Sequence, residues 1–100
     1  MIIGEVTKTA SESVARSINF TNRLATGETA TLVSVVVTRI PTGEDVTATL
    51  IDAAPGPAIT GGTVSFIIIG GVSGESYMIA ATISTSGREV LEDHLQLLIN

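Results

Sequence analysis

The chain has 100 residues, enough for one domain with a single core, and 44% of them are hydrophobic while only 3% are aromatic. Its net charge of −5 and its scattered basic residues argue against a nucleic-acid partner, because phosphate binding needs clustered Lys and Arg. Cysteine is absent, which excludes disulfides and thiolate metal sites, and neither a signal-peptide pattern nor a long apolar run is present. We therefore expect a soluble protein that is made in the cytoplasm and spans no membrane.

Residues 1–13 are mostly polar and carry no clear pattern. We interpret them as an N-terminal arm, with a short edge strand as the alternative. The folded domain is then residues 14–100. Its first strand is expected at Val14–Phe20, with Ile18 and Phe20 on the inner face.

The middle of the chain predicts two further strands. Thr29–Ile40 is rich in β-branched residues, which favours strand over helix, and its alternation predicts an inner face of Val33, Val35 and Val37. Val46–Ile51 alternates in the same way after a turn that contains Pro and Gly. Both segments are therefore expected to be strands.

Two strands are expected between residues 58 and 69. Ala58–Thr60 follows a Pro-rich segment and is expected to be a short edge strand. Thr63–Ile69 is more regular, with Val64, Phe66 and Ile68 on one face.

The last third of the chain predicts a β-hairpin. Ser76–Ser84 and Glu89–Ile99 both alternate with period two, and a short turn at residues 85–88 joins them. We expect Gly87 to take the positive φ angle that a three-residue hairpin loop requires.

Six clear strands and one weak one, with turn signals between them, predict an all-β fold. The most probable architecture is an immunoglobulin-like antiparallel β-sandwich of about seven strands, and a small barrel is the competing arrangement. Tyr77 supports the sandwich, because it opens the penultimate strand directly after a glycine corner at Gly74. Its hydroxyl can form a hydrogen bond back across that corner.

The sequence offers little catalytic chemistry. His94 is the one histidine, on the face opposite Leu95, so it predicts neither a general base nor a zinc site. The Glu44-Asp45 pair is expected to be a solvated turn, since too few oxygen ligands cluster there for calcium. Glu92 and Asp93 are neighbours in a strand and point to opposite faces. We therefore predict a protein that is not an enzyme and binds no cofactor or metal.

A candidate partner surface comes from apolar residues on the outward-facing positions of two strands. If Val35 and Phe66 point inward, then Val36, Ile67 and Ile69 point outward. In an immunoglobulin-like sandwich the second and fifth strands are neighbours, so these three side chains would form one apolar stripe. Such stripes mark partner surfaces, although β-branched residues are also common on ordinary exposed strands.

Three segments together resemble a known family of small phage virion proteins, the fibre–tail adaptor group. Ser17–Thr29 is similar to its aromatic-then-LxxGE corner, and Gly70–Tyr77 to its GGxxGxxY entry into the penultimate strand. Thr82–Arg88, followed by Leu91-Glu92-Asp93, is similar to its TSxGR…LED hairpin, with one extra residue before the acidic pair. The resemblance covers most of the chain from about Lys8, although Thr63–Ile69 lacks the Trp often found there.

The resemblance implies an immunoglobulin-like, non-catalytic connector in the virion of a tailed phage or prophage. Such a protein lies in the tail or neck, contacts neighbouring tail, neck or fibre proteins, and forms a ring-like homo-oligomer. Arg88, at the tip of the last hairpin, would pair with an acidic group of a partner, or would simply be a solvated turn residue.

The alternative function is an immunoglobulin-like binding module that attaches to carbohydrate or to a cell surface. The absence of Trp and the scarcity of other aromatics argue against stacking on sugars.

Overall fold

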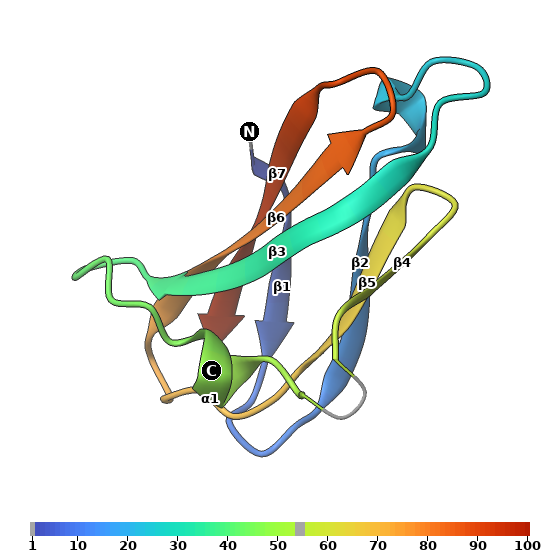
Figure 1. Cartoon of the computed structure of the whole chain (residues 1–100). Coiled ribbons are helices and arrows are strands. Elements are labelled where there is room, and N and C mark those ends of the chain that lie inside the picture. The colour runs from blue at the N-terminus through green and yellow to red at the C-terminus, as the bar shows by residue number, and fades with distance from the viewer. Residues whose placement is uncertain (1, 54–55) are drawn as a thin grey trace.

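The computed structural model describes residues 2–53 and 56–100, with only the backbone described for residues 2 and 3. These residues form two packed sheets with seven strands between them (Figure 1). The larger sheet has the strand order β1 (Ile2–Lys8), β7 (Val90–Ile99), β6 (Ser76–Thr85) and β3 (Ala30–Arg39). The smaller sheet has the order β2 (Val14–Asn19), β5 (Thr63–Ile68) and β4 (Ala58–Thr60).

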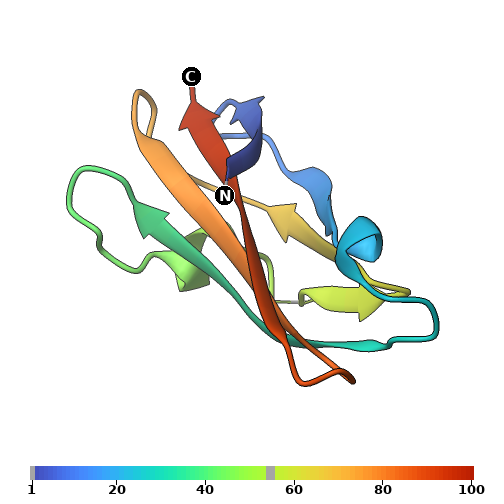
Figure 2. The ribbon, with the colours of Figure 1, turned by 90° about the horizontal axis from the view of Figure 1, so that it is seen from above.

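Seen from above, the two sheets form the two layers of a sandwich (Figure 2). Two short helices lie in the connections, η1 (Thr21–Arg23) and α1 (Thr47–Leu50). The predicted all-β sandwich of about seven strands is confirmed. None of the helices in the described part of the chain is long and apolar enough to cross a membrane.

The hairpin of β6 and β7 forms the centre of the larger sheet, as predicted. Tyr77, Ile79, Ala81 and Ile83 alternate along β6 on the inner face, and all four are buried. Apolar side chains of β7 and of the smaller sheet pack against them in one core. The core consists mostly of branched aliphatic side chains, which is the packing that a chain poor in aromatic residues requires.

Residues 2–8 form a strand at the edge of the larger sheet. The N-terminal segment therefore contains the short edge strand that was the alternative to an arm. β1 pairs with β7 in parallel, whereas the other strand pairs are antiparallel. Val6 and Lys8 point into the sandwich and are buried. The Lys8 ammonium donates hydrogen bonds to the carbonyl of Thr9, at 2.7 Å, and to that of Gly70. Burial lowers the pKa of Lys8, and the nearby Glu12 carboxylate opposes this effect.

The predicted strand at Val46–Ile51 is wrong, because Thr47–Leu50 is the short helix α1. The carboxylate of Asp45 accepts hydrogen bonds from the Thr47 backbone N–H at 3.0 Å and from its hydroxyl at 2.7 Å. This local turn starts the helix and leaves Leu50 and Ile51 buried. An alternation over six residues cannot distinguish these two structures.

A β-bulge corrects the predicted inner face of β3. The pairing of β3 with β6 shifts between Leu32 and Ser34, and this shift turns Val33 outward to 58% exposure. Val35 and Val37, beyond the bulge, are buried as predicted. The side chains that point inward therefore do not follow one uninterrupted alternation along β3, because the bulge shifts it by one residue.

Candidate assembly surface

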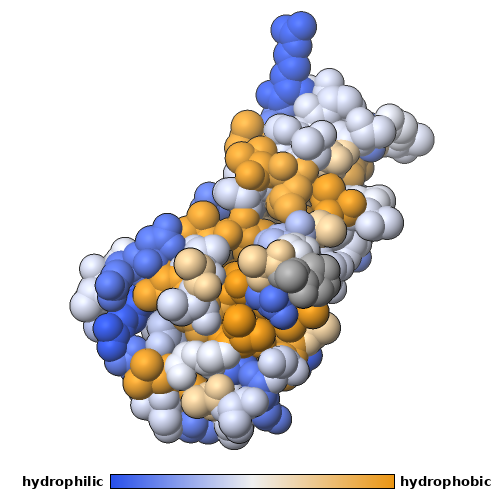
Figure 3. Space-filling view, turned by 60° about the horizontal axis from the view of Figure 1, so that its bottom comes forward, coloured by the Kyte–Doolittle hydropathy of each residue, from blue (hydrophilic) through white to orange (hydrophobic). Residues whose placement is uncertain are grey.

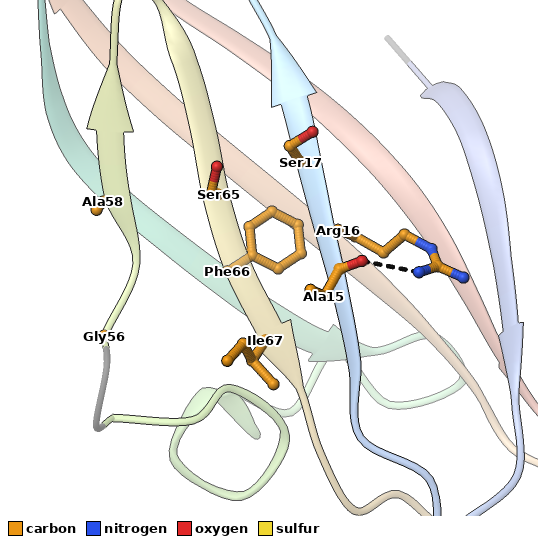
Figure 4. Close-up of a pocket in the computed structure, with 8 residues that line it drawn as sticks. All are labelled: Ala15, Arg16, Ser17, Gly56, Ala58, Ser65, Phe66 and Ile67. Atoms are coloured by element: carbon orange, nitrogen blue, oxygen red, sulfur yellow. Dashed lines mark hydrogen bonds between the residues drawn. The ribbon is translucent and has the colours of Figure 1, made fainter.

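The outer face of the smaller sheet carries Ile67 and a shallow hollow of about 420 Å³ (Figure 4). Small side chains line much of the hollow, among them Ala15 and Ser17 of β2 and Ser65 of β5. Arg16 extends away from β5 and donates to the Ala15 carbonyl at 2.7 Å. This face is therefore flat and carries little charge.

Ile69 lies just beyond β5, next to α1. Its backbone N–H donates to the Leu50 carbonyl at 2.9 Å, and its side chain is half-buried. The backbone of Ile51 bridges to Ile68 in the same place. Ile69 thus belongs to the end of the sandwich that holds α1.

Val36 lies on the other sheet, so the predicted stripe of Val36, Ile67 and Ile69 does not form as one surface. The outward faces of two packed sheets point in opposite directions, and β3 and β5 belong to different sheets. The rule that the second and fifth strands are neighbours does hold here. Because residues 2–8 form the first strand, the second is Val14–Asn19, and this strand pairs with β5.

Val36 instead has apolar neighbours on β6. It lies opposite Ala80 in the pairing of β3 with β6, and Met78 follows on the same face. Like Val33 at the bulge, the other outward positions of these two strands carry no charged side chain: Thr31, Ser34, Val36, Thr38, Ser76, Met78, Ala80, Thr82 and Ser84. We call these nine residues the uncharged face.

Charge begins on the next strand, β7. Oε2 of Glu92 and Nε2 of His94 lie within hydrogen-bond distance, at 2.5 Å, on the outer side of the sheet, and the Thr82 hydroxyl donates to Glu92 at 3.2 Å. The hydrogen bond from His94 lowers the pKa of Glu92, with a smaller contribution from Thr82. This pair marks one border of the uncharged face.

The tip of the β6–β7 hairpin holds Arg88. Here Arg88, with φ of 68°, takes the left-handed conformation that we predicted for Gly87, so that prediction is wrong. Gly87 serves close packing instead: a Cβ atom there would lie 2.3 Å from Oε2 of Glu28. The Gly87 N–H donates to the same oxygen at 3.0 Å. Among the described residues, the Arg88 side chain has no ion-pair partner.

The loop that precedes β3, which contains Ala25, Glu28 and Thr29, holds this tip in place. The Ser86 N–H donates to the Thr29 carbonyl at 2.9 Å, and the Thr29 N–H donates to the Ser86 hydroxyl at 3.0 Å. Glu28 also accepts from the Ala25 N–H at 2.9 Å. Hydrogen bonds from Ala25 first, then from Thr85 and Gly87, lower the pKa of Glu28.

At the opposite end of β6, the predicted hydrogen bond of Tyr77 is present. Its hydroxyl accepts from the Val72 N–H at 3.2 Å and donates to Glu75 at 3.0 Å. Gly74, with φ of 86°, turns the chain there and donates to the Ile99 carbonyl at 2.7 Å. Glu75 also pairs with Arg39, so the corner ties β6, β3 and β7 together.

The same end of the molecule has a second hollow, of about 260 Å³, and exposed apolar side chains. Its lining includes Leu50, Val72 and Tyr77. Val72 is 56% exposed. In a view with the lower end of Figure 1 brought forward, apolar surface gathers in the middle and hydrophilic residues lie mostly at the margins (Figure 3).

One ion pair with a single buried partner was not predicted from the sequence. Asp93 points inward from β7 and is only 2% exposed, and its carboxylate lies 2.6 Å from the guanidinium of Arg23 in η1. The signal was its parity: Asp93 falls on the same face as Leu95 and Leu97. Glu92 points the other way, so the two carboxylates diverge as predicted.

The described residues hold no group of three His, Cys, Asp or Glu side chains that could bind a metal ion. The geometry instead provides two flat sheet faces and a rigid hairpin tip. These features define a small β-sandwich module whose accessible surfaces suit contact with other proteins.

Residues 8–98 match the model of the Gp77 family, described as podophage GP4 fiber-tail adaptor protein gp77. The match covers most of the chain, and the chain belongs to this family. The family name describes a structural protein of the phage tail, which places this chain in the virion. No curated protein matches the chain.

Proposed function

We propose that this chain is a non-catalytic adaptor in the tail or neck of a tailed phage or prophage. It connects tail or fibre components by binding neighbouring virion proteins, and it is present as a ring of identical copies. The observation that carries the proposal is the match of residues 8–98 to the adaptor family. The flat sheet faces and the rigid tip support it, because they offer contact area without a reacting group.

The strand arrangement supports an immunoglobulin-like fold. In the seven-stranded form of that fold the first, second, fifth and fourth strands form one sheet, and the third, sixth and seventh form the other. Here β2, β5 and β4 form one sheet, and β3, β6 and β7 form the other, with β1 added beside β7. Such a sandwich is rigid, which suits a connector that must hold two neighbours at a fixed distance.

Antibody labelling of purified particles tests the proposal. An antibody against this chain, applied to particles from an induced lysate, is expected to label the tail or neck. Particles that contain all other tail proteins but carry no label would refute the adaptor function. Labelling of the capsid alone would refute the location.

Lysine substitutions identify the faces that take part. Val36→Lys and Ile67→Lys each place a charge on one sheet face, and Arg88→Glu reverses the charge at the tip. Ile40→Lys, at an exposed position in the turn after β3, is the matched control. We expect Val36→Lys, Ile67→Lys and Arg88→Glu to reduce incorporation into particles while the proteins remain folded. A residue whose variant is incorporated as well as the control is not part of the interface.

A further inference from the structure

The larger sheet ends on one side in a long strand edge that is only partly covered. The Arg39 N–H of β3 donates to the Glu44 carbonyl, and the Val37 carbonyl accepts from the Val46 N–H, both at 2.9 Å. These bonds cover the last residues of β3. Residues 30–36 have no such cover among the described residues, and the segment from Thr29 to Thr38 contains no charge, Gly or Pro.

Proteins normally protect exposed strand edges with charges, prolines or short strands. β3 has ten residues and none of these devices on its free part, apart from the bulge at Val33. An uncharged, β-branched edge of this kind is a template for pairing with another strand.

The other edge of the same sheet is β1, and it matches the free part of β3. Each offers seven residues, and within the described part of the chain β1 pairs with β7 alone. β1 is parallel to β7, β7 is antiparallel to β6, and β6 is antiparallel to β3. The two edges of the sheet therefore run in the same direction.

Edges that run in the same direction can join when copies are related by rotation about a common axis. The larger sheet of one copy would then continue into that of the next by parallel pairing, and repetition closes a ring. Charge does not oppose this contact in a chain of net charge −5, because the free part of β3, residues 30–36, contributes no charge. Of the charged residues of β1, Lys8 is buried and only Glu5 is exposed.

The main competing contact is an antiparallel pair of two β3 edges about a two-fold axis. Val33 is the middle residue of the free segment 30–36, so the bulges of the two copies would meet at the axis. Two opposed bulges would interrupt pairing in the centre of that contact, whereas the β3–β1 contact contains one bulge of β3 and the irregularity of β1 between Ile2 and Gly4, near the end of that strand. We propose that copies of this chain join by pairing of β3 in one copy with β1 in the next. This inference rests on the proposed ring-forming adaptor.

The absence of cysteine from the natural chain makes cross-linking a direct test. Glu5→Cys and Ser34→Cys place one thiol on the outer side of each edge. With a short bismaleimide, the double variant is expected to form a ladder of dimers, trimers and larger species. The matched control combines Glu5→Cys with Thr60→Cys on β4, the edge of the other sheet, and should form no ladder.

Three cross-linking results would overturn the proposal. No ladder from the double variant at high protein concentration would exclude the β3–β1 contact. Dimers from Ser34→Cys alone would indicate the two-fold pairing instead. A ladder of equal strength from the control would show that the products come from random collision.

A second measurement uses two exposed valines of the larger sheet. Val33 lies on the β3 edge and is 58% exposed, and Val90 begins β7, outside the segment from His94 on that pairs with β1, and is 69% exposed. In sedimentation velocity, Val33→Lys should leave only monomer while Val90→Lys assembles like the natural protein. Equal assembly of the two folded variants would overturn the proposal.

These experiments separate the inference from the proposed function. If particles are labelled at the tail but no ladder forms, the adaptor function stands and the edge contact is wrong. If the ladder forms but particles carry no label, the edge contact stands and the adaptor function is wrong.

Discussion

Replacing Arg23 with Gln should destabilise the protein more than replacing its partner Asp93 with Asn. The two charged groups are 2.6 Å apart, with side-chain exposures of 39% and 3%. Without Arg23, the Asp93 carboxylate stays between the sheets with no cation beside it. Without the charge of Asp93, the Arg23 guanidinium can turn into water at little cost.

The size of this difference follows from the burial of the pair. Removing one partner of a fully buried ion pair costs about 3–5 kcal/mol. Because Arg23 keeps 39% of its side-chain exposure, water screens the pair, and we expect about 2–3 kcal/mol for Arg23→Gln. In a domain of this size, that loss lowers the melting temperature by roughly 10–20 °C. Asp93→Asn keeps the volume and one acceptor oxygen, so it should cost about 1 kcal/mol or less.

Urea unfolding and thermal melting of both variants and of the double variant test this asymmetry. The double variant should match Asp93→Asn, because the loss of Arg23 matters only while the buried charge is present. Arg16→Gln is the control, since Arg16 is exposed and its side chain donates to the Ala15 carbonyl of its own strand. The reasoning is wrong if Asp93→Asn costs as much as Arg23→Gln, or if Arg23→Gln costs no more than the control.

Three further predictions concern the hairpin tip and the tyrosine corner. Arg88→Gly should stabilise the protein by about 0.5–1 kcal/mol in urea unfolding, because an Arg residue in the left-handed conformation is strained. Gly87→Ala should destabilise the protein, because the added methyl group would push against Glu28. Effects of the same sign would contradict this geometry. Tyr77→Phe should cost about 1–2 kcal/mol by the same assay, since a backbone N–H loses its acceptor, and an unchanged stability would show that the corner does not need the hydroxyl. Hydrogen bonds from the Ala25 N–H and from other donors keep the pKa of Glu28 in the folded state low. The carboxylate therefore stabilises the fold at pH values above the pKa of Glu28 in the unfolded state. This stabilisation is lost as the pH falls through the pKa of the folded state. The melting temperatures of the natural protein and Glu28→Gln should therefore differ most near neutral pH and converge in acid; a constant difference would refute this origin.

Sequence periodicity predicted the long, regular strands best. β6 and β7 alternate over ten residues each, and their buried positions follow that alternation without interruption. The hydroxyl bond of Tyr77 could also be predicted, because it depends on a residue type at a glycine corner five residues from its donor. Features that are local in sequence were therefore accessible from the sequence alone.

Features that depend on a distant segment were not. β1 is a strand because it pairs with β7, about ninety residues later, and its own pattern is too weak to predict this. Missing this strand made Val14–Asn19 the first strand and Ala30–Arg39 the second, and this error placed Val36 beside Ile67. From Ala58–Thr60 on, the predicted count agreed with the structure again, because Val46–Ile51 had been counted as a strand. The partner of Asp93 was hidden for the same reason, since Arg23 lies 70 residues away in a short helix.

The distribution of charge connects the fold with assembly. The chain carries ten acidic and five basic residues, yet the outward positions of β3 and β6 have none of them. Arg23 and Arg39 are held in ion pairs, and Lys8 is buried. A strongly acidic chain keeps free copies apart by repulsion, whereas an uncharged strand edge lets copies pair at short range. If the proposed edge contact is correct, higher salt should therefore strengthen assembly, and a weakening of assembly by salt would point to an ion-paired interface instead.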